Sequence, residues 1–142
     1  MKKTISICLA IYLAIFMTVP AFAADTGGYT VESVMSPKFT YIWSISAGLD
    51  ISSAGKALCA GSVDASSNSY TAELTVSLQK NTSSGWTTIK SWNGSGSGQG
   101  LIVENYYYVS KGTYRVCSTA KIYNSAGTLL ETQSLYSAEK TY

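Results

Sequence analysis

Two tryptophans six residues apart have a spacing that could serve ligand binding. In an unbroken strand, Trp86 and Trp92 share one face about 20 Å apart, while Ile89 points to the opposite face. If Ile89 belongs to the core, both indoles face outward, where they could stack on sugar rings or anchor a partner. The alternative is that they pack in the core or cover its edge, as large apolar side chains usually do.

Three consecutive tyrosines, Tyr106, Tyr107 and Tyr108, are a second candidate for contact with a ligand. Because neighbouring strand residues alternate between faces, either Tyr107 or the pair Tyr106 and Tyr108 must lie at the surface. We take Tyr107, together with Trp86 and Trp92, as the candidate ligand-binding residues. The alternative is that the tyrosines reflect ordinary strand propensity on a half-exposed sheet.

Histidine is absent from the chain, which excludes Ser-His-Asp and Cys-His catalysis and every histidine-ligated metal site. The carboxylates are scattered, without the spacing of a calcium loop or an evident acid pair; they include Asp50, Asp64, Glu73, Glu104 and Glu131. We therefore predict no catalytic residue, no metal and no cofactor, and a protein that is not an enzyme. The only arginine, Arg115, is expected to pair with Glu104 or Glu131, or to stack on a tyrosine.

Cys59 and Cys117 are a candidate disulfide, because they fall on two predicted strands that immunoglobulin domains bridge. Two observations oppose the bridge. Alternation places Cys117 on the polar face with Arg115 and Cys59 on an apolar face, and Tyr114 lies three residues before Cys117 rather than two. Two unpaired thiols are the alternative.

The first 23 residues have the pattern of a secretory signal peptide. Lys2 and Lys3 precede the uncharged apolar run 5–19, which is shorter than the roughly 20 residues of a spanning helix, and Ala21-Phe22-Ala23 is a cleavage signal. We expect cleavage after Ala23, secretion, and no membrane anchor afterwards. The formal charge of +2 would fall to zero with the loss of both lysines, so charge gives no argument for nucleic acid.

Runs of alternating apolar and polar residues, separated by Gly- and Ser-rich turns, predict seven strands. They lie at 39–51, 56–65, 70–80, 86–92, 101–109, 113–123 and 129–136. Residues 24–38 are interpreted as an extended N-terminal arm, and Asn93 to Gly100 as a flexible Gly/Ser loop. The pattern predicts an all-β domain over 39–142, an antiparallel immunoglobulin-like sandwich, with a small barrel as the alternative.

The same alternation predicts which side chains fill the core. The expected core positions are Leu74, Val76, Leu78, Tyr114, Val116 and Ile122, and the expected exposed positions are Glu73, Thr75, Arg115 and Lys121. Trp43 alternates with Tyr41 and Ile45, so we expect its indole to be buried.

Several short motifs lie in or next to these predicted strands: Phe39-Thr40-Tyr41-Ile42, Leu49-Asp50-Ile51, Gly55-Lys56-Ala57, Leu78-Gln79-Lys80, Gly85-Trp86, Ser91-Trp92, Gly112-Thr113-Tyr114-Arg115 and Leu130-Glu131-Thr132. In their order and spacing the chain resembles short secreted β-sandwich proteins of Gram-positive bacteria, a family catalogued as a domain of unknown function. The resemblance covers most of residues 24–142. It implies export and a β-sandwich, and it brings no catalytic residue.

Together these observations favour a secreted binding or interaction module, either free or loosely associated with the cell wall. Its expected partner is cell-wall polysaccharide or another extracellular protein. One alternative is a wall-glycan hydrolase, which would need two carboxylates converging in a cleft. The other is a secreted toxin or its immunity factor.

Overall fold

A computed structural model of the chain describes residues 31–34 and 39–142. The predicted signal peptide and most of the N-terminal arm lie outside these residues. Within them the chain forms strands and no helix, as predicted for an all-β domain. The strands are β1 (Val31–Val34), β2 (Ile42–Ile51), β3 (Lys56–Ala65), β4 (Thr71–Thr82), β5 (Gly85–Ser97), β6 (Leu101–Tyr108), β7 (Thr113–Tyr123), β8 (Leu129–Tyr136) and β9 (Lys140–Thr141).

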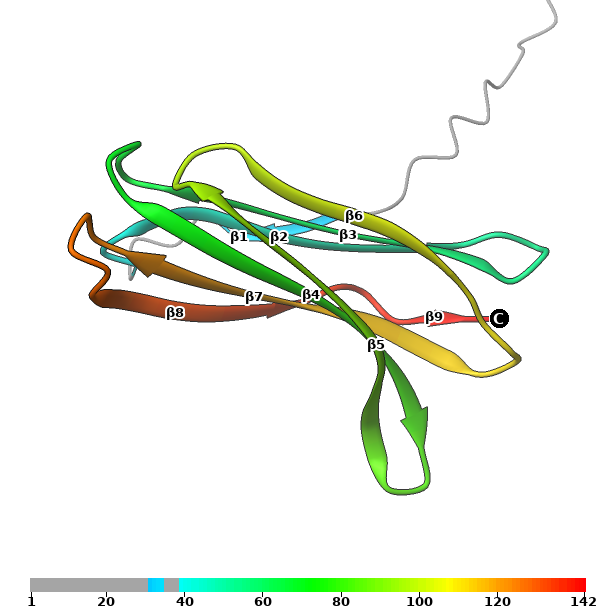
Figure 1. Cartoon of the computed structure of the whole chain (residues 1–142). Coiled ribbons are helices and arrows are strands. Elements are labelled where there is room, and N and C mark those ends of the chain that lie inside the picture. The colour runs from blue at the N-terminus through cyan, green and yellow to red at the C-terminus, as the bar shows by residue number, and fades with distance from the viewer. Residues whose placement is uncertain (1–30, 35–38) are drawn as a thin grey trace, which may run out of the picture.

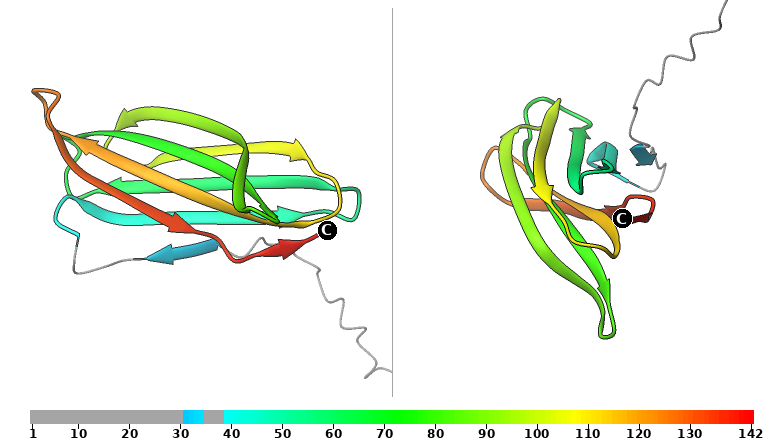
Figure 2. Two further views of the ribbon diagram at one scale, coloured as in Figure 1. Left: turned by 90° about the horizontal axis from the view of Figure 1, so that it is seen from below. Right: turned by 90° about the vertical axis from the view of Figure 1, so that its right-hand side faces the viewer.

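Two antiparallel sheets pack face to face (Figure 1). One has the strand order β1-β2-β3-β6, and the other β5-β4-β7-β8, with the short β9 also paired to β7. In immunoglobulin terms, β2, β3 and β6 take the places of strands A, B and E, and β5, β4, β7 and β8 those of C′, C, F and G. The predicted immunoglobulin-like sandwich is confirmed, and the hairpin of β4 and β5 extends beyond both layers (Figure 2).

The core lies where β4 and β7 keep an uninterrupted alternation. All six predicted core side chains are at most 1% exposed. Glu73 and Lys121 are exposed as predicted, whereas Thr75 and Arg115 are half-buried. Thr75 lies against a neighbour, donating a hydrogen bond to Asn93 Oδ1 at 2.8 Å, and Arg115 is enclosed by aromatic rings described below.

Tyr114 fastens the connection between β6 and β7. Its buried hydroxyl donates a hydrogen bond of 2.7 Å to the backbone carbonyl of Ser110. The ammonium of Lys80 lies 5.4 Å from the centroid of the same ring and donates to the Ser110 hydroxyl at 3.0 Å. This is the tyrosine corner of immunoglobulin-like domains, in which a strand-F tyrosine holds the preceding loop.

Glu131 fastens the opposite sheet from its position on β8. Its Oε2 accepts the backbone N–H groups of Tyr41 and Ile42 at 2.8 and 2.9 Å, and its Oε1 that of Thr40 at 3.4 Å. Hydrogen bonds to an ionised acceptor are stronger than neutral ones. The carboxylate therefore fixes the point at which β2 enters its sheet.

Two β-bulges change which side chains face the core. In β2, Ile42 and Ser44 pair with the adjacent residues Ala65 and Asp64, so Trp43 is an extra residue. In β5, Ile89 is extra in the same way. A one-residue shift moves the following side chains to the other face of a strand. Ile42 consequently occupies the core and Trp43 is 62% exposed, so the predicted burial of Trp43 is wrong.

Asn93 to Gly100 is not the flexible loop that its composition predicts. Residues 93–97 continue β5 and pair with β4, which leaves only 98–100 as the connection to β6. Gly94 faces β6 so closely that an added Cβ would lie 2.7 Å from Val103 Cγ2. Gly98 is buried and donates its N–H to the Tyr70 carbonyl at 2.8 Å. These glycines allow neighbouring strands to approach closely. The segment therefore has the composition of a flexible linker but not its structure.

Leu74→Ala should lower the free energy of unfolding by about 2–5 kcal/mol, because Leu74 is fully buried in the core between the sheets. Lys121→Ala, at an exposed position of β7, should change it by less than about 0.5 kcal/mol. Urea unfolding of both variants measures the difference. Equal midpoints for the two variants would contradict the assignment of faces.

Candidate functional site

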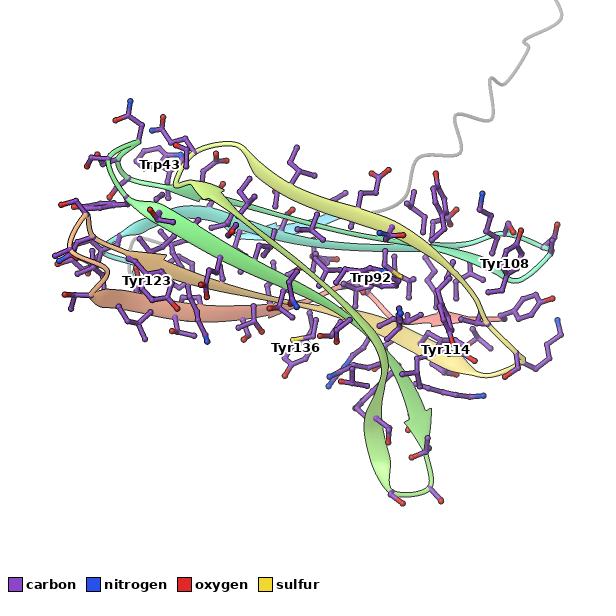
Figure 3. The ribbon with its side chains drawn as sticks, viewed as in Figure 1. Trp43, Trp92, Tyr108, Tyr114, Tyr123 and Tyr136 are labelled. Carbon is purple, nitrogen blue, oxygen red and sulfur yellow. The ribbon has the colours of Figure 1, made fainter. Side chains whose placement is uncertain are left out.

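A cavity of about 470 Å³ lies beside Trp43 at one end of the sandwich. Its lining comes from three segments: the bulge of β2, the end of β3 with the β3–β4 turn, and the β5–β6 connection. Figure 3 shows Trp43 at this end, where the β3–β4 and β5–β6 connections gather. We call this site the Trp43 pocket; it is lined by Trp43, Asp64, Ala65, Ser66 and Gln99.

Asp64 holds the pocket together. Its Oδ1 accepts the backbone N–H of Gly100 at 2.7 Å, and its Oδ2 accepts the Ser44 hydroxyl at 3.1 Å. The carboxylate thereby ties the β5–β6 connection to β2 and fixes the backbone that carries Gln99. Both of its oxygens are engaged in this structural role, although each retains a further lone pair for a ligand.

The remaining wall is polar and anchored through its backbone. The Ser66 N–H donates to the Tyr41 carbonyl at 2.8 Å, and the Ala65 N–H donates to the Gly98 carbonyl. The side chains of Ser66 and Gln99 are exposed at the rim. The pocket thus offers an exposed indole, a hydroxyl, an amide and a carboxylate on a fixed backbone.

Trp86 and Trp92, predicted to share an outer face, point to opposite sides of their sheet. Trp92 pairs with the buried Val76 and packs against the core. Trp86 pairs with Asn81, on the outer side. The physical reason is the extra residue Ile89 between them, which reverses the alternation.

Trp86 is occupied by a contact within the domain. The guanidinium carbon of Arg115 lies 4.2 Å from the Trp86 ring centroid and 4.0 Å from that of Tyr136, and Arg115 Nε donates to Gln79 Oε1 at 2.9 Å. Stacking on a tyrosine, one of the alternatives considered for Arg115, is therefore confirmed. The cation–π stack joins the β4–β5 hairpin to β7 and β8.

The tyrosines of β6 divide between its two faces as alternation requires. Tyr107 lies opposite the buried Ala57, on the core side, although 37% of its surface is exposed at the sheet edge. Tyr106 and Tyr108 lie on the outer face with larger exposed fractions, 50% and 70%. Alternation allowed either Tyr107 or the pair Tyr106 and Tyr108 to face outward. The structure places Tyr106 and Tyr108 on the outer face.

Cys59 and Cys117 are both free thiols in the described part of the chain. Cys59 is fully buried on the core face of β3, and burial raises the pKa of its thiol to about 12. Cys117 lies on the outer face of β7, where its Sγ is 3.8 Å from Thr119 Oγ1. The two side chains point to different faces, as the alternation indicates, so the candidate disulfide is not formed.

The carboxylates considered for catalysis lie apart. Asp64 is on the outer side of the first sheet, whereas Glu73 on β4 faces outward from the second and accepts the Tyr123 hydroxyl at 2.9 Å, which raises the pKa of that tyrosine. Glu131 is engaged by the β2 backbone. Among residues 31–34 and 39–142, no group of three or more His, Cys, Asp or Glu side chains could hold a metal ion.

A second cavity, of about 420 Å³, lies along β4 and β5. Its lining consists of Glu73, Leu74, Thr75, Asn93, Gly94 and Ser95. It has no aromatic wall, and the hydrogen bond between Thr75 and Asn93 uses part of its polar capacity. The Trp43 pocket is therefore the better candidate for ligand binding.

None of the protein-family models, curated proteins or solved structures compared with the chain matches it. The resemblance to secreted proteins of Gram-positive bacteria stays a prediction. Within the described ranges, no helix has the length and apolar character to cross a membrane.

Alkylation of the folded protein at pH 8 should modify Cys117 and spare Cys59. The thiolate is the reactive form, and the buried Cys59 thiol has a pKa of about 12, so it should react only after unfolding. Peptide mapping by mass spectrometry reads the two cysteines separately. A linked Cys59–Cys117 peptide, or equal labelling of both in the folded state, would contradict this arrangement.

Proposed function

We propose that the protein is a secreted glycan-binding module whose ligand stacks on Trp43. The observation that carries this proposal is the exposure of the Trp43 indole beside a cavity with polar walls. Trp92, by contrast, packs against the core, and Trp86 is engaged by Arg115. Trp43 is therefore the tryptophan whose ring is available to an external partner.

The chemistry of the pocket suits a sugar. The flat indole offers apolar surface to the C–H face of a pyranose ring, and the polar rim can pair with ring hydroxyls. Asp64 accepts hydrogen bonds, Gln99 both donates and accepts, and the Ser66 hydroxyl does either. Because Asp64 already holds the Gly100 backbone and Ser44, part of this wall is ordered before a ligand arrives.

Binding without cleavage is favoured over the alternative of a wall-glycan hydrolase. Glycoside hydrolysis uses two carboxyl groups about 5–9.5 Å apart across the scissile bond. Among the described residues, Asp64 is the one carboxylate in the pocket lining, and its oxygens are engaged by Ser44 and Gly100. We therefore propose cell-wall polysaccharide as the partner, bound outside the cell and left intact.

Trp43→Ala should weaken binding to insoluble glycans at least about fivefold, because aromatic stacking contributes about 1–3 kcal/mol where it has been measured on nucleic-acid bases. The measurement is co-sedimentation with purified peptidoglycan and with chitin, a neutral glycan. Trp43→Phe, which keeps a flat ring, should retain part of the affinity. The unfolding midpoint should hardly change, since Trp43 is mostly exposed.

Trp86→Ala is the matched control, because it removes the same side chain from the outer side of the other sheet. It should leave glycan binding intact. If Trp86→Ala abolishes binding while Trp43→Ala does not, the ligand lies on the hairpin and the proposed site is wrong.

A further inference from the structure

We propose that the opposite end of the sandwich is a second binding site, one that takes a linear polyanion. Four residues form it, and we call them the lysine–tyrosine row: Lys56, Tyr106, Lys111 and Tyr142. The Lys56 ammonium lies 4.0 Å from the centroid of the Tyr106 ring, and the Lys111 ammonium lies 3.8 Å from that of Tyr142. Each cation is therefore held over an aromatic face rather than on a freely moving stem.

The two pairs lie near each other at Gly55, in the β2–β3 turn. An added Cβ on Gly55 would lie 2.8 Å from the Tyr142 ring, so this ring packs directly on the turn that precedes Lys56. The Gly55 φ of +77° also favours glycine there. The backbone of Tyr142 exchanges two hydrogen bonds with Gly112, next to Lys111. The row thus consists of two ring–ammonium pairs, contributed by β3, β6, the β6–β7 connection and the residue that follows β9.

More positive charge gathers at the same end. Lys80 and Lys140 both pair with Tyr114, from the two strands beside β7. The acidic side chains nearby are Asp50, two residues before the β2–β3 turn, and Glu139. The backbone oxygen of Tyr142 accepts the Gly112 N–H at 3.1 Å, so it adds no free acceptor at this end. The net charge of this end is therefore slightly positive. The exposed side chains of Lys56 and Lys111 carry the part of that charge that a ligand can reach.

The composition of the row indicates the class of ligand. A lysine ammonium stacked on a ring keeps its charge and its hydrogen-bond donors, so it can bind a phosphate or carboxylate group. Two such cations beside aromatic rings match a linear chain that carries repeated anions, with its backbone against the tyrosines. Tyr108, which is paired with Lys56 across β3 and β6, extends the exposed aromatic surface.

This site is independent of the Trp43 pocket. Figure 3 shows Trp43 and Tyr108 at opposite ends of the sandwich. The pocket presents an indole with uncharged and acidic groups, whereas the row presents cations. A polymer surface that displays both neutral sugar and repeated anions could engage both ends, and two linked contacts raise the overall affinity above that of either one.

The test is binding of the full chain to inorganic polyphosphate and to poly-glutamate, measured by calorimetry at two salt concentrations. The double variant Lys56→Gln/Lys111→Gln should weaken polyanion binding at least tenfold and make the remaining binding less sensitive to salt. The matched control is Lys90→Gln/Lys121→Gln, which removes the same charge from exposed positions of β5 and β7 and should leave binding nearly unchanged. Lys56→Arg/Lys111→Arg keeps charge and stacking, and it should preserve binding even if the glutamine variant is unstable.

Three outcomes would overturn the second site: no binding to either polyanion, an equal loss in the control variant, or a loss of charge-dependent binding in Trp43→Ala. Binding of polyphosphate but not poly-glutamate would assign the ligand to phosphate polymers, and the reverse to carboxylate polymers. Because the chitin measurement contains no polyanion, a failure of the Trp43 pocket appears there and leaves the polyphosphate result unaffected.

Discussion

The alternation of side chains along each strand is the constraint on which this sandwich depends. A core between two sheets requires every second residue to point inward, and one extra residue exchanges the inward and outward sets. β4 and β7 have no interruption where they pair with each other, so Leu74, Val76, Val116 and Ile122 fill the centre completely. In β2 and β5 a bulge exchanges the inward-facing and outward-facing residues. These two bulges determine which tryptophan side chain is exposed to solvent.

The sequence was sufficient for the regular part of the fold and insufficient at its irregular positions. The alternation in β4 and β7 predicts both the sandwich and its core, and it places Cys117 correctly on the outer face. Nothing in the residue types marks Trp43 or Ile89 as an extra residue, because a bulge is defined by the pairing with another strand. Unbroken alternation therefore predicts Trp43 in the core and Trp86 and Trp92 on one face, and the bulges make both predictions wrong. The predicted flexible loop around Gly94 and Gly98 is wrong for a related reason, because close packing and flexible linkers both favour glycine.

Both proposed sites lie at the ends of the sandwich, where connections between strands meet on a rigid framework. At one end, Asp64 ties the β5–β6 connection to β2 beside Trp43. At the other, Tyr114 holds the β6–β7 connection, and the Tyr142 ring packs on Gly55. Binding residues on loops that a packed scaffold positions are common, because the scaffold fixes their geometry while the loops are free to vary. The contacts that fix these connections thus account for where the two proposed sites lie.

The exposure of Trp43 relative to the other two tryptophans is the central claim, and collisional quenching of indole fluorescence measures it directly. Iodide should quench mainly the emission of Trp43, because Trp92 packs against the core and the ring of Trp86 is stacked with Arg115. Replacement of Trp43 by phenylalanine should therefore remove most of the quenchable signal, whereas the same change at Trp92 should remove little. If the quenchable signal survives in Trp43→Phe and disappears in Trp92→Phe, the bulge in β2 does not turn Trp43 outward and the pocket is not a binding site.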